Sequence, residues 1–167
     1  YNPDDSAFYT LGPGGTASLL TDQKFVNVEN VTWSPRRTQA ILEYPDGSNI
    51  VYDFNTRKQL TLPKEMESFS FDASGSRIAA VWDVGEPDNT WLMVGNADGT
   101  GLEVVEPLGN NKTDVDVSFS PDNQVVALYR QASNAGQQEI IPLGRNQENF
   151  RSFTVDGLKF ESKYSPS

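Results

Sequence analysis

The chain has 167 residues, of which 37% are hydrophobic and 22% are charged, a composition typical of one folded domain and not of a disordered segment. Its net charge of −10 argues against binding to nucleic acid, because contact with a phosphate backbone requires clustered Lys and Arg. No apolar run approaches the ~20 residues that span a bilayer, so we expect no membrane insertion by this segment; an anchor outside it stays possible.

The first 24 residues are expected to form the trailing hairpin of a β-sheet. A strand is expected over Ala7–Thr10, a turn over Gly12–Gly15 and the partner strand over Ala17–Thr21. Glycine supplies the positive φ that such tight turns need.

A repeated pattern follows this hairpin. It occurs at Val31–Leu42, Phe69–Trp82 and Val117–Tyr129, and it begins again at Tyr164. The aromatic residues that mark the copies are spaced by 38, 48 and 45 residues and are Trp33, Phe71, Phe119 and Tyr164. Propeller blades of four strands repeat at roughly 40–45 residues, so this period favours a β-propeller.

Each copy is predicted to be a hairpin whose second strand is covered on both faces. The apolar runs Ala40–Leu42, Ile78–Ala80 and Val126–Leu128 stand at the same distance from the aromatic residue. An unbroken apolar run between turn signals is typical of a strand in a buried sheet. We expect the aromatic residues at this fixed position to pack between blades, and Trp82 and Trp91 to pack in the core, with one of the two partly exposed.

A second hairpin follows each copy. Its strands are expected at Asn49–Phe54 and Gln59–Leu62, at Thr90–Val94 and Leu102–Val105, and at Gln138–Leu143 and Phe150–Thr154. The chain is therefore predicted to be all-β and to form a single propeller segment. Full four-stranded antiparallel blades are expected over residues 31–62, 69–105 and 117–154. The hairpin 1–24 precedes them, and the first strand of a further blade follows over 158–167.

These pieces are expected to belong to a larger propeller. A ring closed from them alone would leave its last blade without a second strand. The chain starts with Tyr1 and stops a few residues into a copy of the repeat, so we expect it to be an excerpt of a longer protein.

Three segments resemble the WSPDG-x-x-IAF core of WD40-like propellers and, more closely, the TolB-type repeat of bacterial envelope proteins: TWSPRRTQAILEY, SFDASGSRIAAVW and SFSPDNQVVALYR. The hairpins NIVYDFNTRKQLT and TWLMVGNADGTGLEVV resemble the continuation of that repeat. The Pro-Asp-Gly turn of the pattern is never intact here, becoming Pro-Arg-Arg, Ala-Ser-Gly and Pro-Asp-Asn. The resemblance implies a bacterial propeller that serves as an interaction platform outside the cytoplasm.

The residue types limit the chemistry of this segment. The segment contains no His and no Cys, so it cannot form a Ser-His-Asp or Cys-His catalytic site. For the same reason it cannot form a zinc site with His or Cys ligands. The stretches Asp83–Asn89 and Asn96–Gly99 lack the alternating acidic ligands of a calcium loop. We therefore expect no enzyme activity and no cofactor in this segment.

Charge is predicted to separate between the two ends of the sheets. The loops that join blades, together with those that join second and third strands, carry twelve acidic and four basic residues, whereas the remaining turns carry four acidic and seven basic residues. The candidate partner-binding residues are seven acids of the first group: Glu43, Asp46, Asp83, Glu86, Asp88, Asp114 and Asp116. Such a field would speed the approach of a basic partner, although acidic loops are also ordinary solvated surface.

Three functions stay open at this stage. The first is a non-enzymatic scaffold for protein–protein interaction, with a basic partner favoured by the acidic loops. The second is a regulatory or substrate-gating propeller of a prolyl-oligopeptidase-like hydrolase whose catalytic domain lies outside the segment. The third is a propeller that binds sugars or cations.

Overall fold

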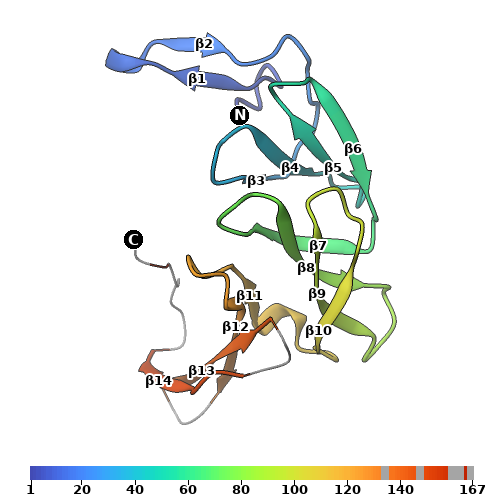
Figure 1. Ribbon diagram of the computed structural model, residues 1–167, viewed down its shortest axis with the longest axis vertical. Helices are drawn as coiled ribbons and strands as arrows, with labels where there is room; N and C mark the ends of the chain where they lie inside the picture. Colours follow the sequence, from blue (N-terminus) through green and yellow to red (C-terminus); the bar gives the residue numbers. More distant parts are fainter. Residues whose placement is uncertain (133–135, 146–148, 158–163, 165–167) are drawn as a thin grey trace. The chain divides into compact units, whose positions relative to one another are not determined.

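The computed structural model describes residues 1–132, 136–145, 149–157 and 164. Within these residues the chain is built from β-strands and two short 3₁₀ turns, and it divides into two compact units, Tyr1–Lys64 and Glu65–Ser167 (Figure 1). Each unit contains its own hydrophobic core. The predicted strand within 158–167 lies outside the described residues, apart from Tyr164.

The first unit holds a hairpin and one four-stranded sheet. The hairpin pairs β1 (Tyr9–Leu11) with β2 (Ala17–Leu19) across the 3₁₀ turn η1 (Pro13–Gly15). The strands of the sheet follow one another in sequence order and are β3 (Asn30–Trp33), β4 (Gln39–Glu43), β5 (Asn49–Asp53) and β6 (Lys58–Leu62). The expected first strand, Ala7–Thr10, is shifted: Ala7 bridges to Asn2, and regular pairing starts at Tyr9.

Aromatic side chains join the hairpin segment to this sheet. Phe8 is fully buried and contacts Phe25, Phe54 and Trp33, with ring centroids 5.2 to 5.6 Å apart. Trp33 stacks on Phe54 at 5.1 Å and meets Phe8 of the preceding hairpin segment edge-on, which agrees with the prediction that it packs between blades, although 38% of it stays exposed. Phe71, at the same position of the repeat on β7, is only 7% exposed.

The second unit holds two four-stranded sheets. The strands of the first sheet are β7 (Met66–Phe71), β8 (Arg77–Asp83), β9 (Thr90–Asn96) and β10 (Glu103–Pro107). The strands of the second are β11 (Val115–Val117), β12 (Val125–Ala132), β13 (Gln137–Gly144) and β14 (Phe153–Asp156), and the 3₁₀ turn η2 (Lys112–Asp114) precedes them. All neighbouring strands are antiparallel, in simple up-and-down order.

The core of the second unit lies between its two sheets. It combines Val81, Leu92 and Val105 of the first sheet with Val126 and Leu143 of the second. Two hydrogen bonds also join the sheets: Phe119 N donates to Ser70 Oγ at 3.1 Å, and Ala73 N donates to Asn123 Oδ1 at 2.9 Å. The sheets therefore face each other as successive blades do.

The second strand of each sheet is buried, as predicted. Ala40, Ile41 and Leu42 are fully covered, as are Ile78, Ala79 and Ala80, and Val126 and Ala127. Each of these strands has a partner on both sides. Phe71 and Phe119 are also buried, at 7% and 9% exposure, whereas Trp82 and Trp91 are both half-buried.

The turn between the first two strands has the same hydrogen bonds in all three sheets. It begins at a buried polar residue, Ser34, Asp72 or Ser120, whose side-chain oxygen accepts a bond from the backbone N–H five residues later, at 3.0 to 3.2 Å. The backbone N–H of that polar residue donates to the carbonyl at the same later position. A buried acceptor satisfied in this way fixes the hairpin geometry.

Candidate functional site

Two of the seven predicted site residues belong to the first unit. Glu43 is the last residue of β4, and Asp46 lies in the turn to β5. The carboxylate of Asp46 accepts hydrogen bonds from Ser48 Oγ at 2.6 Å and Ser48 N at 3.0 Å, and these bonds lower the pKa of Asp46. Asp46 is exposed, so it adds negative charge to the surface while also holding its own turn.

The other five belong to the second unit. Asp83 ends β8, Glu86 and Asp88 lie in the loop between β8 and β9, Asp114 is in η2 and Asp116 is on β11. Glu86, Asp88 and Asp114 are exposed, whereas Asp83 and Asp116 are half-buried. The seven residues thus do not form one cluster within a single unit.

The loop between β8 and β9 is anchored to the connection between β10 and β11. Asp88 N donates to Asn110 Oδ1 at 3.1 Å, and Leu108 N donates to Thr90 O at 2.8 Å. Asp83 also accepts a bond from Gly85 N at 2.8 Å at the start of the loop. These bonds fix the backbone that presents the two exposed carboxylates, Glu86 and Asp88.

Lys112 reduces the negative charge at the base of this loop. Its ammonium group donates a short hydrogen bond to Asp83 and lies 3.1 Å from Glu67 Oε1. The bond from Lys112 is the main cause that lowers the pKa of Asp83, and the bonds to Asp83 and Glu67 raise the pKa of Lys112. Asp83 therefore ties η2 to the end of β8, a role the sequence did not reveal because Lys112 is 29 residues away.

A tyrosine hydroxyl lies near Asp116. Burial raises the pKa of Tyr164 to about 12, and the carboxylates of Asp116 and Asp122 add to this effect. The hydroxyl of Tyr164 is buried and has no hydrogen-bond partner among the described residues. Because its pKa is raised to about 12, the phenol of Tyr164 is neutral near pH 7.

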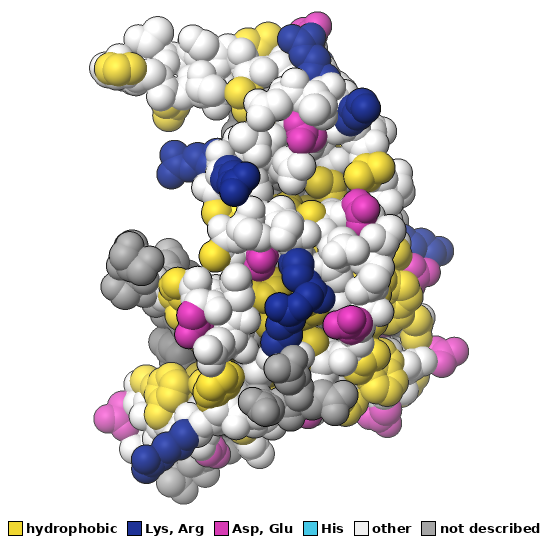
Figure 2. All heavy atoms as spheres, in the orientation of Figure 1, with side chains coloured by type: hydrophobic (Ala, Val, Ile, Leu, Met, Phe, Trp, Pro, Cys, Tyr) yellow, Lys and Arg dark blue, Asp and Glu magenta, His cyan; other side chains and the backbone are white. Residues whose placement is uncertain are grey.

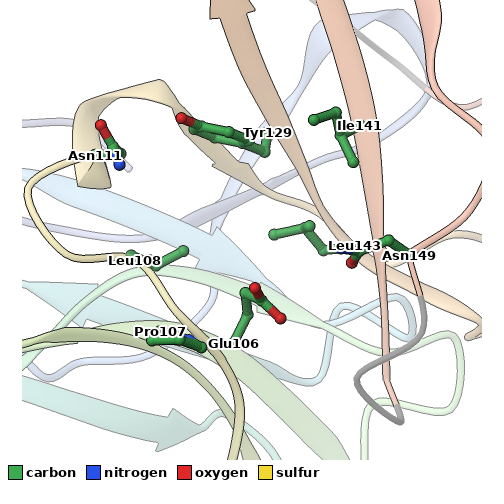
Figure 3. A pocket seen from close by; sticks show the side chains of 8 residues that line it. All are labelled: Glu106, Pro107, Leu108, Asn111, Tyr129, Ile141, Leu143 and Asn149. Atoms are coloured by element: carbon green, nitrogen blue, oxygen red, sulfur yellow. The ribbon is translucent and has the colours of Figure 1, made fainter.

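A pocket of about 200 Å³ opens between the two sheets of the second unit (Figure 3). Its apolar lining comes from both sheets and their connection, and its polar lining consists of the Glu106 carboxylate, the Tyr129 hydroxyl and two amides. The lining residues are Glu106, Pro107, Leu108, Asn111, Tyr129, Ile141, Leu143 and Asn149. Glu106 is one of the twelve acidic loop residues, but the sequence gives no sign that it lines a pocket. Its neighbours in the pocket, Ile141 and Leu143, lie more than thirty positions away in the chain.

Acidic and basic side chains are interspersed on the molecular face shown in Figure 2, with uncharged surface between them. Hydrophobic side chains are visible at the tip of the β1–β2 hairpin, where Leu11 is 76% exposed. Among the residues that the structure describes, no three acidic side chains gather closely enough to form a metal site. Within the same residues, no helix has the length and apolar character needed to cross a membrane.

No known protein-family model matches the chain, and no curated protein matches it significantly in sequence. Its fold is similar to that of several solved structures. A structure assigned to TolB of Agrobacterium tumefaciens matches 92% of this chain and 58% of its own length, with 16% identity and a TM-score of 0.56. The β-propeller domain of the Trilobed protease from Pyrococcus furiosus, which has an open velcro topology, matches 81% of this chain and 45% of its own, with 9% identity and a TM-score of 0.56.

A prolyl endopeptidase is also similar in fold. It matches 93% of this chain and 27% of its own length, with 13% identity and a TM-score of 0.61. The chain spans at most 58% of these three structures. Taken with the three up-and-down sheets, the comparisons confirm the predicted fold class: the chain is a β-propeller segment of four-stranded antiparallel blades, similar to the TolB propeller.

Proposed function

We propose that this propeller segment is a non-enzymatic scaffold for protein–protein interaction, and that it binds a basic partner through the loops around Asp83–Thr90 and Glu106–Asp116. The main support is the loop between β8 and β9, which is anchored at Asn110 and carries the exposed carboxylates of Glu86 and Asp88. A rigid scaffold that presents exposed charged loops is suited to recognition. Charge complementarity of this kind mainly accelerates association.

The structure shows which residues give a clean test. Reversal of Asp83 would place a second cation beside Lys112, so it would disturb the fold as well as the surface. Glu86→Lys combined with Asp88→Lys changes two exposed side chains. Because Asp88 has a left-handed φ of 60°, thermal melting of this variant checks that the loop stays folded. The control is Asp98→Lys combined with Asp122→Lys, which changes the net charge equally in turns at the other end of the sheets. Because both carboxylates accept hydrogen bonds within their own turns, thermal melting checks that this control stays folded.

The measurement is binding of a fluorescein-labelled lysine-rich peptide, followed by anisotropy across ionic strengths from about 0.05 to about 0.5 M. We expect the Glu86/Asp88 reversal to weaken binding about ten-fold at low salt and to flatten its salt dependence. The Asp98/Asp122 reversal should change binding far less. Equal losses in both variants would reduce the effect to net charge and would contradict the proposal.

The scaffold is proposed to work outside the cytoplasm, in the periplasm or at the cell surface. The support is the similarity of its repeats and fold to TolB. Fractionation of the cells that produce the protein, with a cytoplasmic marker as control, tests this location. Recovery with the cytoplasmic marker would contradict it.

A second function is favoured by the fold similarity to a prolyl endopeptidase. In that case the segment would gate substrate access to a hydrolase domain elsewhere in the protein. Such a domain would carry a Gly-x-Ser-x-Gly nucleophile motif with later Asp and His. Labelling of the full-length protein by a fluorophosphonate probe would support this function, and absence of labelling would favour the scaffold.

A further inference from the structure

The pocket between the two sheets of the second unit lies next to the proposed binding loops. Leu108 and Asn111 line it, and Asn110 between them accepts the hydrogen bond from Asp88 N. The pocket and the loop that carries Glu86 and Asp88 are therefore joined by one short stretch of backbone. A partner bound to the loop would have the pocket within reach.

The size of the pocket limits what it can hold. Its volume is about 200 Å³, whereas pockets for drug-sized ligands measure roughly 300–1,000 Å³. One long side chain of a partner fits this scale better than a cofactor does. Side chains that fill a pocket near the centre of an interface often contribute most of the binding energy.

The lining combines one anionic group with apolar walls. Figure 3 shows the Glu106 carboxylate directed toward the space bordered by Leu108, Tyr129 and Leu143. Glu106 forms no ion pair or hydrogen bond through its carboxylate with any residue that the structure describes. A half-buried carboxylate without a cation favours a ligand that brings one.

We propose that this pocket binds an arginine side chain of the basic partner, an inference that rests on the proposed scaffold function. The guanidinium group matches a carboxylate through two parallel N–H···O bonds, which the single ammonium of lysine does not reproduce. The aliphatic part of the arginine packs on Leu108, Ile141 and Leu143. The ring of Tyr129 provides a surface for a cation–π contact.

The test uses acetyl-arginine-amide as the probe, with acetyl-lysine-amide, acetyl-norleucine-amide and glucose as comparisons. Each is titrated into the ¹⁵N-labelled protein, and amide chemical shifts are followed. We expect saturable shifts with the arginine probe at Leu108, Asn111 and Ile141, and a Kd on the order of 1 mM. The lysine probe should bind several-fold more weakly.

Two variants connect these shifts to the carboxylate. Glu106→Gln keeps the shape of the side chain and should weaken arginine binding about ten-fold or more. Glu103→Gln removes the same charge from the same strand, where the side chain is 75% exposed, and it should leave the Kd within about two-fold.

Several results would overturn the inference: binding of norleucine as tight as that of arginine, equal binding of lysine, unchanged binding by the Glu106 variant, or shifts with glucose and none with arginine. None of these results depends on the lysine-rich peptide. If the lysine-rich peptide still binds the Glu86/Asp88 variant more weakly than the Asp98/Asp122 variant, the scaffold function stands while the arginine pocket fails.

Discussion

At the scale of single residues, one position of the repeat has left-handed backbone whichever residue occupies it. The position lies four residues after the aromatic and is occupied by Arg37, Gly75 and Asn123, with φ of 56°, 73° and 60°. In each copy its N–H donates to the carbonyl of the buried polar residue that begins the turn, at 2.8 to 3.0 Å. Only glycine adopts this conformation without a steric cost, so Arg37 strains its turn while Gly75 does not.

Replacing Arg37 by glycine is predicted to stabilise the first unit. The left-handed conformation costs a residue with a Cβ about 1–2 kcal/mol, and the entropy of glycine in the unfolded chain offsets part of that gain. We expect the free energy of unfolding to rise by about 0.5–1 kcal/mol, measured by urea denaturation. Asn123→Gly is the control, because it relieves the same strain but loses the bond from Ala73 N and should bring no gain. A gain as large in Asn123→Gly would show that this bond contributes little.

Lys112 is predicted to make stability depend on pH in two ranges. The folded protein lowers the pKa of Asp83, so this stabilisation is present above the unfolded pKa of the carboxyl and is lost as the pH falls through the lowered value. The pKa of Lys112 is raised, so its contribution is present below its unfolded pKa of 10.5 and is lost as the pH rises through the raised value.

We expect Lys112→Met to reduce stability by at most about 1 kcal/mol near neutral pH, because Lys112 is partly exposed and solvent screens its pairs. Denaturation of both proteins at a series of pH values measures the difference. The difference in stability between the two proteins should shrink in strong acid and in strong base. A difference that stays constant with pH would mean that the methylenes of Lys112, and not its charge, stabilise the connection.

At the scale of the elements, the turn from β9 to β10 packs closely around a glycine. A Cβ on Gly95 would stand 2.7 Å from Leu102 Cδ2 and 3.1 Å from Thr100 O. Leucine could move its end, but the carbonyl belongs to the backbone of the turn.

Gly95→Ala is therefore predicted to destabilise the second unit by about 1–3 kcal/mol, the usual range for overpacking. Gly12→Ala is the matched control, because its Cβ would lie 3.6 Å from Thr16 O, an ordinary contact. Thermal unfolding of the two variants gives the comparison. Equal melting temperatures would show that the turn relaxes around the new methyl group.

The strands were largely predictable because their apolar runs and turn residues repeat. The expected strands Gln59–Leu62 and Leu102–Val105 differ from β6 and β10 by one or two residues at their ends. Other features depend on contacts that sequence spacing does not record. The bulge between Glu67 and Ser70, the bond from Lys112 to Asp83 and the pocket at Glu106 all arise from residues brought together by the sheets.

At the scale of the whole molecule, the two units have separate cores of different character. The first is built on aromatic rings, with Phe8, Phe25, Tyr52 and Phe54 buried, and the second on aliphatic side chains between two sheets. The predicted single segment over residues 1–167 thus contains two regions that each bury their own apolar surface.

The second unit, Glu65–Ser167, is predicted to fold when produced alone. Its core residues, including Val81, Leu92, Val126 and Leu143, all lie within the unit, and chains of roughly 100 residues bury enough surface to be stable. Trp82 and Trp91, which pair across β8 and β9, report on its packing through near-ultraviolet circular dichroism. We expect the fragment to keep this signal and to melt cooperatively, whereas Tyr1–Lys64, with its smaller core, should be only marginally stable alone. A fragment 65–167 with strand content but without a cooperative melt would show that its two sheets need the first unit to pack.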